Sequence, residues 1–311
     1  MFLKVAMPVV VAGLLVGVGP VAASTPPDDP PEALPAAVLF DEGSLHSLIN
    51  LMDPDGSDVV FVRRRLGTTG GGAAFVPSGK RIVFSDKRDP DHNAPDIYRM
   101  RRDGTHLRQL TIAAAGDTQP DPSPDGRQVI FTRTVRGASF VFRMRETGET
   151  ESRPAEKLAA GWDPEFTPDG RRIVFISARN DSNADVWIMR SNGTHLVQLT
   201  RSQPERDANP VVSPDGRQIV WVRETSLFHM RIDGTHKRRL TDPDVSDRGP
   251  VFSPNGAYVM FSRVQDLQYD DVDILRKPFP KGAAVNLSAD GESTLEWVQD
   301  WWSPRLASVP G

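Results

Sequence analysis

The sequence contains no cysteine among its 311 residues. This absence excludes disulfide bonds, cysteine metal sites, cysteine nucleophiles and a lipid-modified cysteine. Without disulfide bonds, the chain must gain its stability from a packed core. A chain of this length can bury one large core.

Basic residues are also not in excess, because 37 Lys and Arg stand against 41 Asp and Glu, giving a net charge of −4. This balance excludes nucleic acid and an acidic membrane surface as expected partners. The repeated units described below show no helical period, which argues against helical repeats. The Gly-x-Ser-x-Gly motif of α/β-hydrolases does not occur either.

Only one apolar run stands out, at residues 5–18, after a single positive charge at Lys4. It is followed by Val21-Ala22-Ala23, which fits the small-residue rule for cleavage. We therefore predict a signal peptide at residues 1–23, and the run is too short for a comfortable membrane span. The alternative is a retained N-terminal anchor. After cleavage we expect an exported protein, periplasmic or secreted, with no membrane span and with a flexible Pro- and Asp-rich spacer at residues 24–35.

The most informative stretch is Asn209–Thr241, which predicts four short strands. Pro214-Asp215-Gly216 forms a tight turn between the first two, since Pro presets one backbone angle and Gly accepts a positive one. Asp233-Gly234 is a two-residue hairpin signal between the last two.

This unit recurs along the chain. Each tight turn is followed by a β-branched strand that ends in an aromatic residue, at Phe84, Phe131, Phe175, Trp221 and Phe261. The steps between these aromatic residues are 47, 44, 46 and 40 residues. A period in the forties with four strands per unit indicates β-propeller blades.

The two ends of the chain predict how the ring closes. Residues 38–63 supply three strands without an innermost one, and Asp300–Pro304 is an innermost strand with nothing after it. We therefore predict an all-β fold at residues 36–306, a six-bladed β-propeller with four antiparallel strands per blade. Strands from both termini complete one blade, which removes two open sheet edges. Residues 307–311 form a tail, and we expect a monomer.

The repeat, Ser-Pro-Asp-Gly-Arg-x-Ile-Val-Phe, then Asp-Ile-Tyr-x-Met, then Asp-Gly-Thr-His-x-x-x-Leu-Thr, resembles the TolB-type propeller repeat. The resemblance covers residues 36–306, without the α/β domain that precedes the propeller in TolB. Such propellers occur in binding proteins and in several hydrolases and lyases, so the repeat specifies a fold more than a function.

Two sets of residues look like metal ligands at first sight. His106, His195 and His236 each follow a Gly-Thr pair, but we place them on turns of three different blades, where they cannot converge on one ion. Asp181-x-Asn183-x-Asp185 resembles the start of a calcium loop without its Gly and distal Glu. Because Asp185 recurs as Asp96 and Asp273, we assign it a turn or cap role in each blade. We predict no metal ligands and no catalytic residues.

The candidate site lies where the innermost strands begin, since these ends should converge on the mouth of the central channel. Charged, polar and aromatic residues that we place there are Asp117, Trp162, Asp163, Asp207, Asn209, Arg248, Asp300 and Trp301. The alternative is that these charges only solvate the channel and pair with neighbours.

In TolB-like proteins the channel end receives an extended peptide, so the resemblance implies a protein or peptide partner from the envelope or the secreted proteins. On the same grounds a calcium ion in the channel is compatible with the sequence, although no cofactor is required. We favour a non-enzymatic binding protein. The alternative is a small carbohydrate-active lyase or hydrolase, or a sugar-binding propeller, that uses channel carboxylates.

Overall fold

The computed structural model describes residues 36–42, 48–64, 72–87, 94–180, 183–266, 271–287 and 296–302. They belong to one compact unit, Leu34–Gly311. The predicted signal peptide (1–23), spacer (24–35) and tail (307–311) lie outside the described residues.

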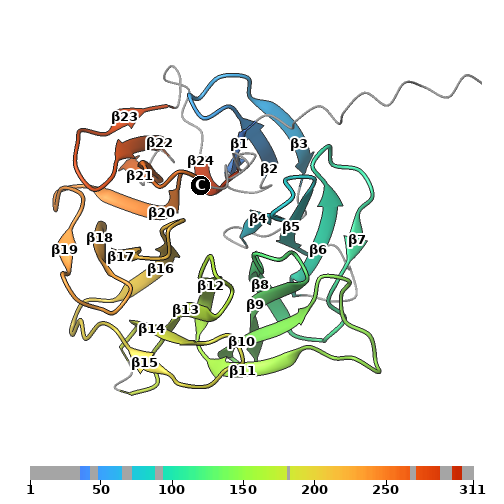
Figure 1. Cartoon of the computed structure of the whole chain (residues 1–311). Coiled ribbons are helices and arrows are strands. Elements are labelled where there is room, and N and C mark those ends of the chain that lie inside the picture. Colours follow the sequence, from blue (N-terminus) through green and yellow to red (C-terminus); the bar gives the residue numbers. More distant parts are fainter. Residues whose placement is uncertain are drawn as a thin grey trace, which may run out of the picture. The chain divides into compact units, whose positions relative to one another are not determined.

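The described residues form six four-stranded antiparallel sheets and no helix. Figure 1 shows these sheets around a common centre, with one strand of each sheet nearest to it. Each innermost strand contacts the innermost strands of both neighbouring sheets, so the ring is closed. The predicted six-bladed propeller is confirmed.

We number the blades in chain order and call their strands a to d from the centre outward. The a strands of blades one to six are β24 (Glu296–Trp302), β4 (Ala73–Phe75), β8 (Gly116–Pro122), β12 (Trp162–Phe166), β16 (Asp207–Val212) and β20 (Ser246–Phe252). The b strands are β1 (Ala37–Glu42), β5 (Arg81–Asp86), β9 (Gln128–Val135), β13 (Arg172–Ser177), β17 (Gln218–Arg223) and β21 (Tyr258–Asp266). The c strands are β2 (Leu48–Met52), β6 (Asp96–Arg101), β10 (Ala138–Arg145), β14 (Asp185–Arg190), β18 (Ser226–Arg231) and β22 (Asp271–Pro278). The d strands are β3 (Val60–Arg64), β7 (Arg108–Gln109), β11 (Glu156–Ala160), β15 (Val197–Gln198), β19 (Arg238–Arg239) and β23 (Val285–Asn286).

The turn between strands a and b shows why the repeat needs its residues. In blade three, the Asp125 carboxylate accepts hydrogen bonds from the Ser123 hydroxyl at 2.6 Å and from the Arg127 amide at 3.0 Å. Gly126 follows with a φ of 68°, a left-handed conformation that favours glycine. Side-chain hydrogen bonds of this kind fix a tight turn locally, so the motif predicts the turn without tertiary information.

The two ends of the chain complete blade one together. Strand β24 pairs antiparallel with β1, and Val38 lies opposite Trp301. Blade one therefore takes its a strand from the C-terminal end of the chain and its other three strands from the N-terminal end, as predicted.

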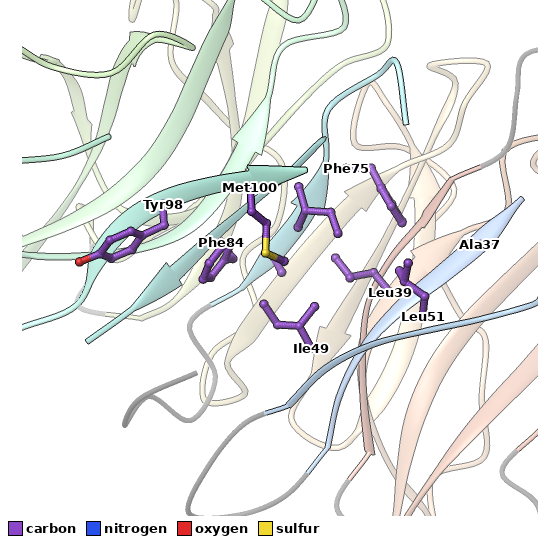
Figure 2. Close-up of a cluster of buried hydrophobic side chains, with 10 residues drawn as sticks. Ala37, Leu39, Ile49, Leu51, Phe75, Phe84, Tyr98 and Met100 are labelled. Atoms are coloured by element: carbon purple, nitrogen blue, oxygen red, sulfur yellow. The ribbon is translucent and has the colours of Figure 1, made fainter. Parts of the chain in front are cut away.

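The hydrophobic core lies between blades. In the cluster of Figure 2, Leu39 and Ile49 of blade one pack with Phe75, Phe84 and Met100 of blade two, and all five are buried. Each blade covers the face of the next, so burial of apolar surface holds the ring together.

Candidate functional site

The a strands carry a β-bulge at the same level of the ring. Register shifts interrupt their pairing with the b strands of blades three to six. At the bulge, Gln119, Asp163 and Asn209 have positive φ angles of 54°, 49° and 44°. Such conformations are costly for residues other than glycine, and bulges re-aim side chains at functional sites.

The bulge residues of blades three to five are joined by hydrogen bonds. The Asp163 carboxylate accepts one bond from the Gln119 amide and two from Asn209, from its backbone and side-chain nitrogens, each at 3.1 Å. Gln119 in turn accepts a bond at 2.8 Å from the Thr132 hydroxyl. A continuous polar belt therefore runs across three blades.

A second belt consists of three carboxylates that each bind the next blade. Asp121 accepts a hydrogen bond from the Phe166 amide at 2.8 Å, and Glu165 accepts one from the Val212 amide at 2.9 Å. Asp300 accepts one from the Phe75 amide at 2.8 Å. By pairing with the b strands these acids occupy equivalent positions, opposite Ile130, Val174 and Leu39.

Two of these acids, Asp121 and Glu165, resist ionisation. Burial raises the pKa of Asp121 to about 8, and the charge of Asp300 adds to this. The pKa of Glu165 is raised well above its usual range by burial and by the charges of Asp121 and Asp300. In the first belt, which Gln119, Asp163 and Asn209 form, burial raises the pKa of Asp163 to about 6. Carboxylates that line the same cavity cannot all be charged without mutual repulsion.

Both belts line a central cavity of about 440 Å³. Four of the predicted site residues contribute to its wall: Asp163, Asn209, Arg248 and Asp300. Arg248 is exposed and forms no ion pair with any described residue. These four residues thus lie in the wall of one cavity, and their role in binding stays a prediction.

Asp117 and Asp207 lie away from this cavity. Asp117 is 0% exposed and binds Arg133 through two hydrogen bonds of 2.7 Å. Asp207 is 1% exposed and pairs with Arg223 at 2.8 Å. Each of these acids starts an a strand and meets an arginine of the b strand 16 positions later, as Asp247 does with Arg263.

Of the two predicted tryptophans, only the side chain of Trp162 is described, and it is not part of the cavity wall. Trp162 is half-buried and packs against the core between blades four and five. Trp301 lies in β24 opposite Val38, and its side chain is outside the described part of the structure.

Sequence reasoning missed the other acidic and amide side chains of the cavity wall, namely Gln119, Asp121, Glu165 and Gln299. A signal for two of them existed. Asp121 and Glu165 stand two residues before the Ser/Thr-Pro-Asp-Gly turn, where other blades have Ala74, Val211 and Val251. An acidic residue at an apolar position of a repeat is a candidate for a special role.

The other ligand candidates have structural roles. Asp185 is buried and accepts hydrogen bonds from Thr200, Ser202 and Gln198, which ties strand c to the segment that follows strand d. Asp96 binds Thr111 and Gln109 in the same way. His106, His195 and His236 are exposed in three different turns, and each ring nitrogen contacts the preceding threonine hydroxyl.

Among the described residues, no three His, Asp or Glu side chains are arranged to hold a metal ion. The channel calcium ion stays an untested prediction. The described part of the chain also has no helix that is long and apolar enough to cross a membrane.

Comparison with known proteins identifies the repeats. Residues 147–272 match the family model described as TolB beta propeller domain (PD40). The repeats within residues 147–272 are therefore TolB-like. A 60-residue stretch is 37% identical to the uncharacterized protein Atu1656 of Agrobacterium fabrum, and it spans 19% of this chain and 20% of that relative.

TolB structures share the fold over most of this chain. TolB from Acinetobacter baumannii superposes with a TM-score of 0.68 at 18% identity, over 85% of this chain and 67% of that chain. A putative TolB from Agrobacterium tumefaciens gives 0.65 at 18% identity, over 86% and 99%. An oligogalacturonate lyase in complex with manganese gives 0.54 at 13% identity, over 77% and 70%. At these identities the likeness concerns the fold alone.

Proposed function

We propose that the chain is an exported, non-enzymatic β-propeller that binds an extended segment of another envelope or secreted protein at the mouth of its central channel. The residues that would contact the partner are Asp163, Asn209, Arg248 and Asp300. Export rests on the predicted signal peptide at residues 1–23. The TolB-like repeats favour a protein as the partner.

The observation that carries this proposal is the bulge at one level of the a strands. Left-handed backbone at Gln119, Asp163 and Asn209 costs free energy that a ring of regular strands would avoid. The bulge directs polar side chains to a cavity of about 440 Å³, where exposed Arg248 has no described ionic partner. Convergent polar groups in a concave site are the usual features of a binding site.

The test is affinity capture with a matched pair of charge-reversal variants. Residues 24–311 are used as bait for the envelope and secreted proteins of the producing organism. Arg248→Glu changes the cavity wall, whereas Arg190→Glu makes the same change at an exposed position in blade four, away from the cavity. We expect one protein to be retained by the native chain and by Arg190→Glu but lost with Arg248→Glu. Equal recovery with all three baits would refute a channel-mouth site.

A second candidate function is a carbohydrate-active enzyme or sugar-binding propeller. The observation that favours it is the set of Asp121, Glu165 and Asp300 in the wall of one cavity. The raised pKa of Asp121, about 8, would keep this carboxyl protonated at neutral pH, as a general acid requires.

This candidate is tested by incubating the native chain and Asp121→Asn with acidic and neutral polysaccharides and measuring new chain ends. Product from the native chain alone would replace the binding proposal with an enzymatic one. Binding of a polysaccharide without product would support the sugar-binding form.

A further inference from the structure

One position in every c strand faces the junction with the next blade. In each repeat it lies opposite the b-strand residue that directly precedes the recurring aromatic residue. In blades one to six it is occupied by Leu51, Arg99, Arg143, Ile188, His229 and Arg276.

In three blades an arginine at this position closes the junction. Arg143 donates a hydrogen bond at 2.7 Å to the carbonyl of Ser191, and Arg276 donates one at 2.7 Å to that of Pro54. Arg99 donates one at 3.3 Å to the carbonyl of Glu146. Each acceptor opens the turn between strands c and d of the next blade. In blade four, Ile188 instead belongs to the same apolar cluster as Ile232 of blade five.

The junction between blades five and six has no arginine at this position. His229 of β18 takes the place of the arginine, and Phe279 takes the place of Glu146 and Ser191, since all three donate their amide to the equivalent a–b turn. The imidazole is shorter than an arginine side chain and meets the Phe279 ring edge-on at 5.6 Å. Among the described residues, no group donates to the Phe279 carbonyl.

A cavity of about 290 Å³ remains at this junction. Its wall includes His229, Phe279, Pro280, Asp215, Gln218 and Asn255. The buried Nδ1 atom of His229 has no hydrogen-bond partner. Three other junctions hold a guanidinium group at this place. Here the cavity wall instead includes Phe279, with its ring and a carbonyl that accepts no hydrogen bond from a described residue, and the carboxylate of Asp215.

Charge in the cavity supports a cationic ligand. The Ser213 hydroxyl and the Arg217 amide bind Asp215 and hold the pKa of its carboxyl below the usual range, so this group is anionic at neutral pH. Burial, and then the charge of Arg238, lowers the pKa of His229, so the imidazole is neutral. Arg238 is exposed on the outer strand and is not part of the cavity wall.

We propose that the junction between blades five and six binds a guanidinium group, which occupies the place of the missing arginine beside Phe279 and Asp215. The source is either an arginine side chain of a partner protein or a small free guanidino compound. A planar cation of this kind donates several hydrogen bonds and stacks on aromatic rings. This site is separate from the channel and does not depend on the function proposed for it.

The test is a titration of the full chain, followed through the His229 ring signals by NMR. The probes are methylguanidinium, for a small free compound, and N-acetyl-arginine amide, for an arginine side chain. We expect saturable shifts with at least one probe. Binding by two variants is measured by calorimetry. His229→Arg places a guanidinium on the chain itself and should weaken binding of the probe at least tenfold. His229→Ala leaves the cavity open and should bind the probe as the native chain does.

A matched control comes from blade three, where Arg143→Ala removes the arginine and should create guanidinium binding at a junction that had none. Circular dichroism establishes that each variant is folded. If the native chain gives no saturable shift, or if His229→Arg binds as tightly as the native chain, the proposal is wrong. Binding of methylguanidinium without the arginine amide would assign the site to free compounds, and binding of both would assign it to a side chain as well.

Discussion

The a strands carry two sets of acidic residues that differ in their partners. Asp117, Asp207 and Asp247 are fully buried, and each binds an arginine of its own blade. Asp121, Glu165 and Asp300 are only half-buried, yet each accepts an amide of the next blade, and Asp121 and Glu165 have raised pKa values. Acidic residues of the same strands thus have two roles. One set forms ion pairs within its own blade, and the other set lines the channel.

The largest effect is expected from breaking the paired set. Arg133 binds both Asp117 and Glu149, so Arg133→Ala leaves two buried carboxylates without their cation. We expect a loss of about 3–5 kcal/mol in the free energy of unfolding, measured by urea denaturation.

Two variants check this explanation. Arg223→Ala frees one carboxylate from an arginine that is itself 20% exposed, and should cost about 2 kcal/mol. Arg133→Lys keeps the positive charge but loses the bidentate hydrogen bonds of the guanidinium group. Its loss in the free energy of unfolding should lie between those of Arg133→Ala and Arg223→Ala. Equal losses for Arg133→Ala and Arg223→Ala would contradict the role of the second carboxylate.

Removing a carboxylate from the channel set should instead raise the free energy of unfolding. The pKa of Asp121 is about 8, above its ordinary value of 3.8, so the folded state holds this proton more tightly than the unfolded state. The free energy of unfolding therefore falls as the pH rises from about 4 to about 8. Asp121→Asn keeps an oxygen for the Phe166 amide and removes this penalty. We expect a gain of roughly 1–2 kcal/mol at pH 8 that disappears at pH 4. A gain that does not vary with pH would point to packing instead.

A smaller effect should reveal the repulsion within the channel set. The charge of Asp121 raises the pKa of Glu165, so removing one charge relieves the other acid. We compare the double variant, Asp121→Asn with Glu165→Gln, with the two single variants at pH 8. Its gain in the free energy of unfolding should be less than the sum of the two single gains, by about 0.5 kcal/mol or more. Additive gains, measured by the same denaturation, would show that the two groups titrate independently.

The fold could be predicted because its signals are local. The Ser-Pro-Asp-Gly turn is fixed by hydrogen bonds within six residues. The aromatic residues of the b strands, such as Phe131 and Trp221, are fully buried. The closing strand could be predicted because blade one lacked its a strand.

The site could be predicted only in part because it depends on pairing across strands. Asp117 and Asp207 looked like channel residues until the b-strand arginines were placed beside them. The bulge shifts the register within the a strands of blades three and four, where Asp121 and Glu165 follow the shift and line the channel. Neither effect is written in the residues of the a strand alone.

The closing pair of strands also has a kinetic consequence. Ala37 lies opposite Trp302, so the last ladder of the ring joins residues from the two ends of the chain. Blades two to six are each continuous in sequence and can form in order as the chain emerges. Blade one must wait for the final strand, and closing so long a loop is slow. Pairing of residues 296–302 with β1 therefore closes an open arc of blades into a ring, and we expect it to be a late and slow step of folding.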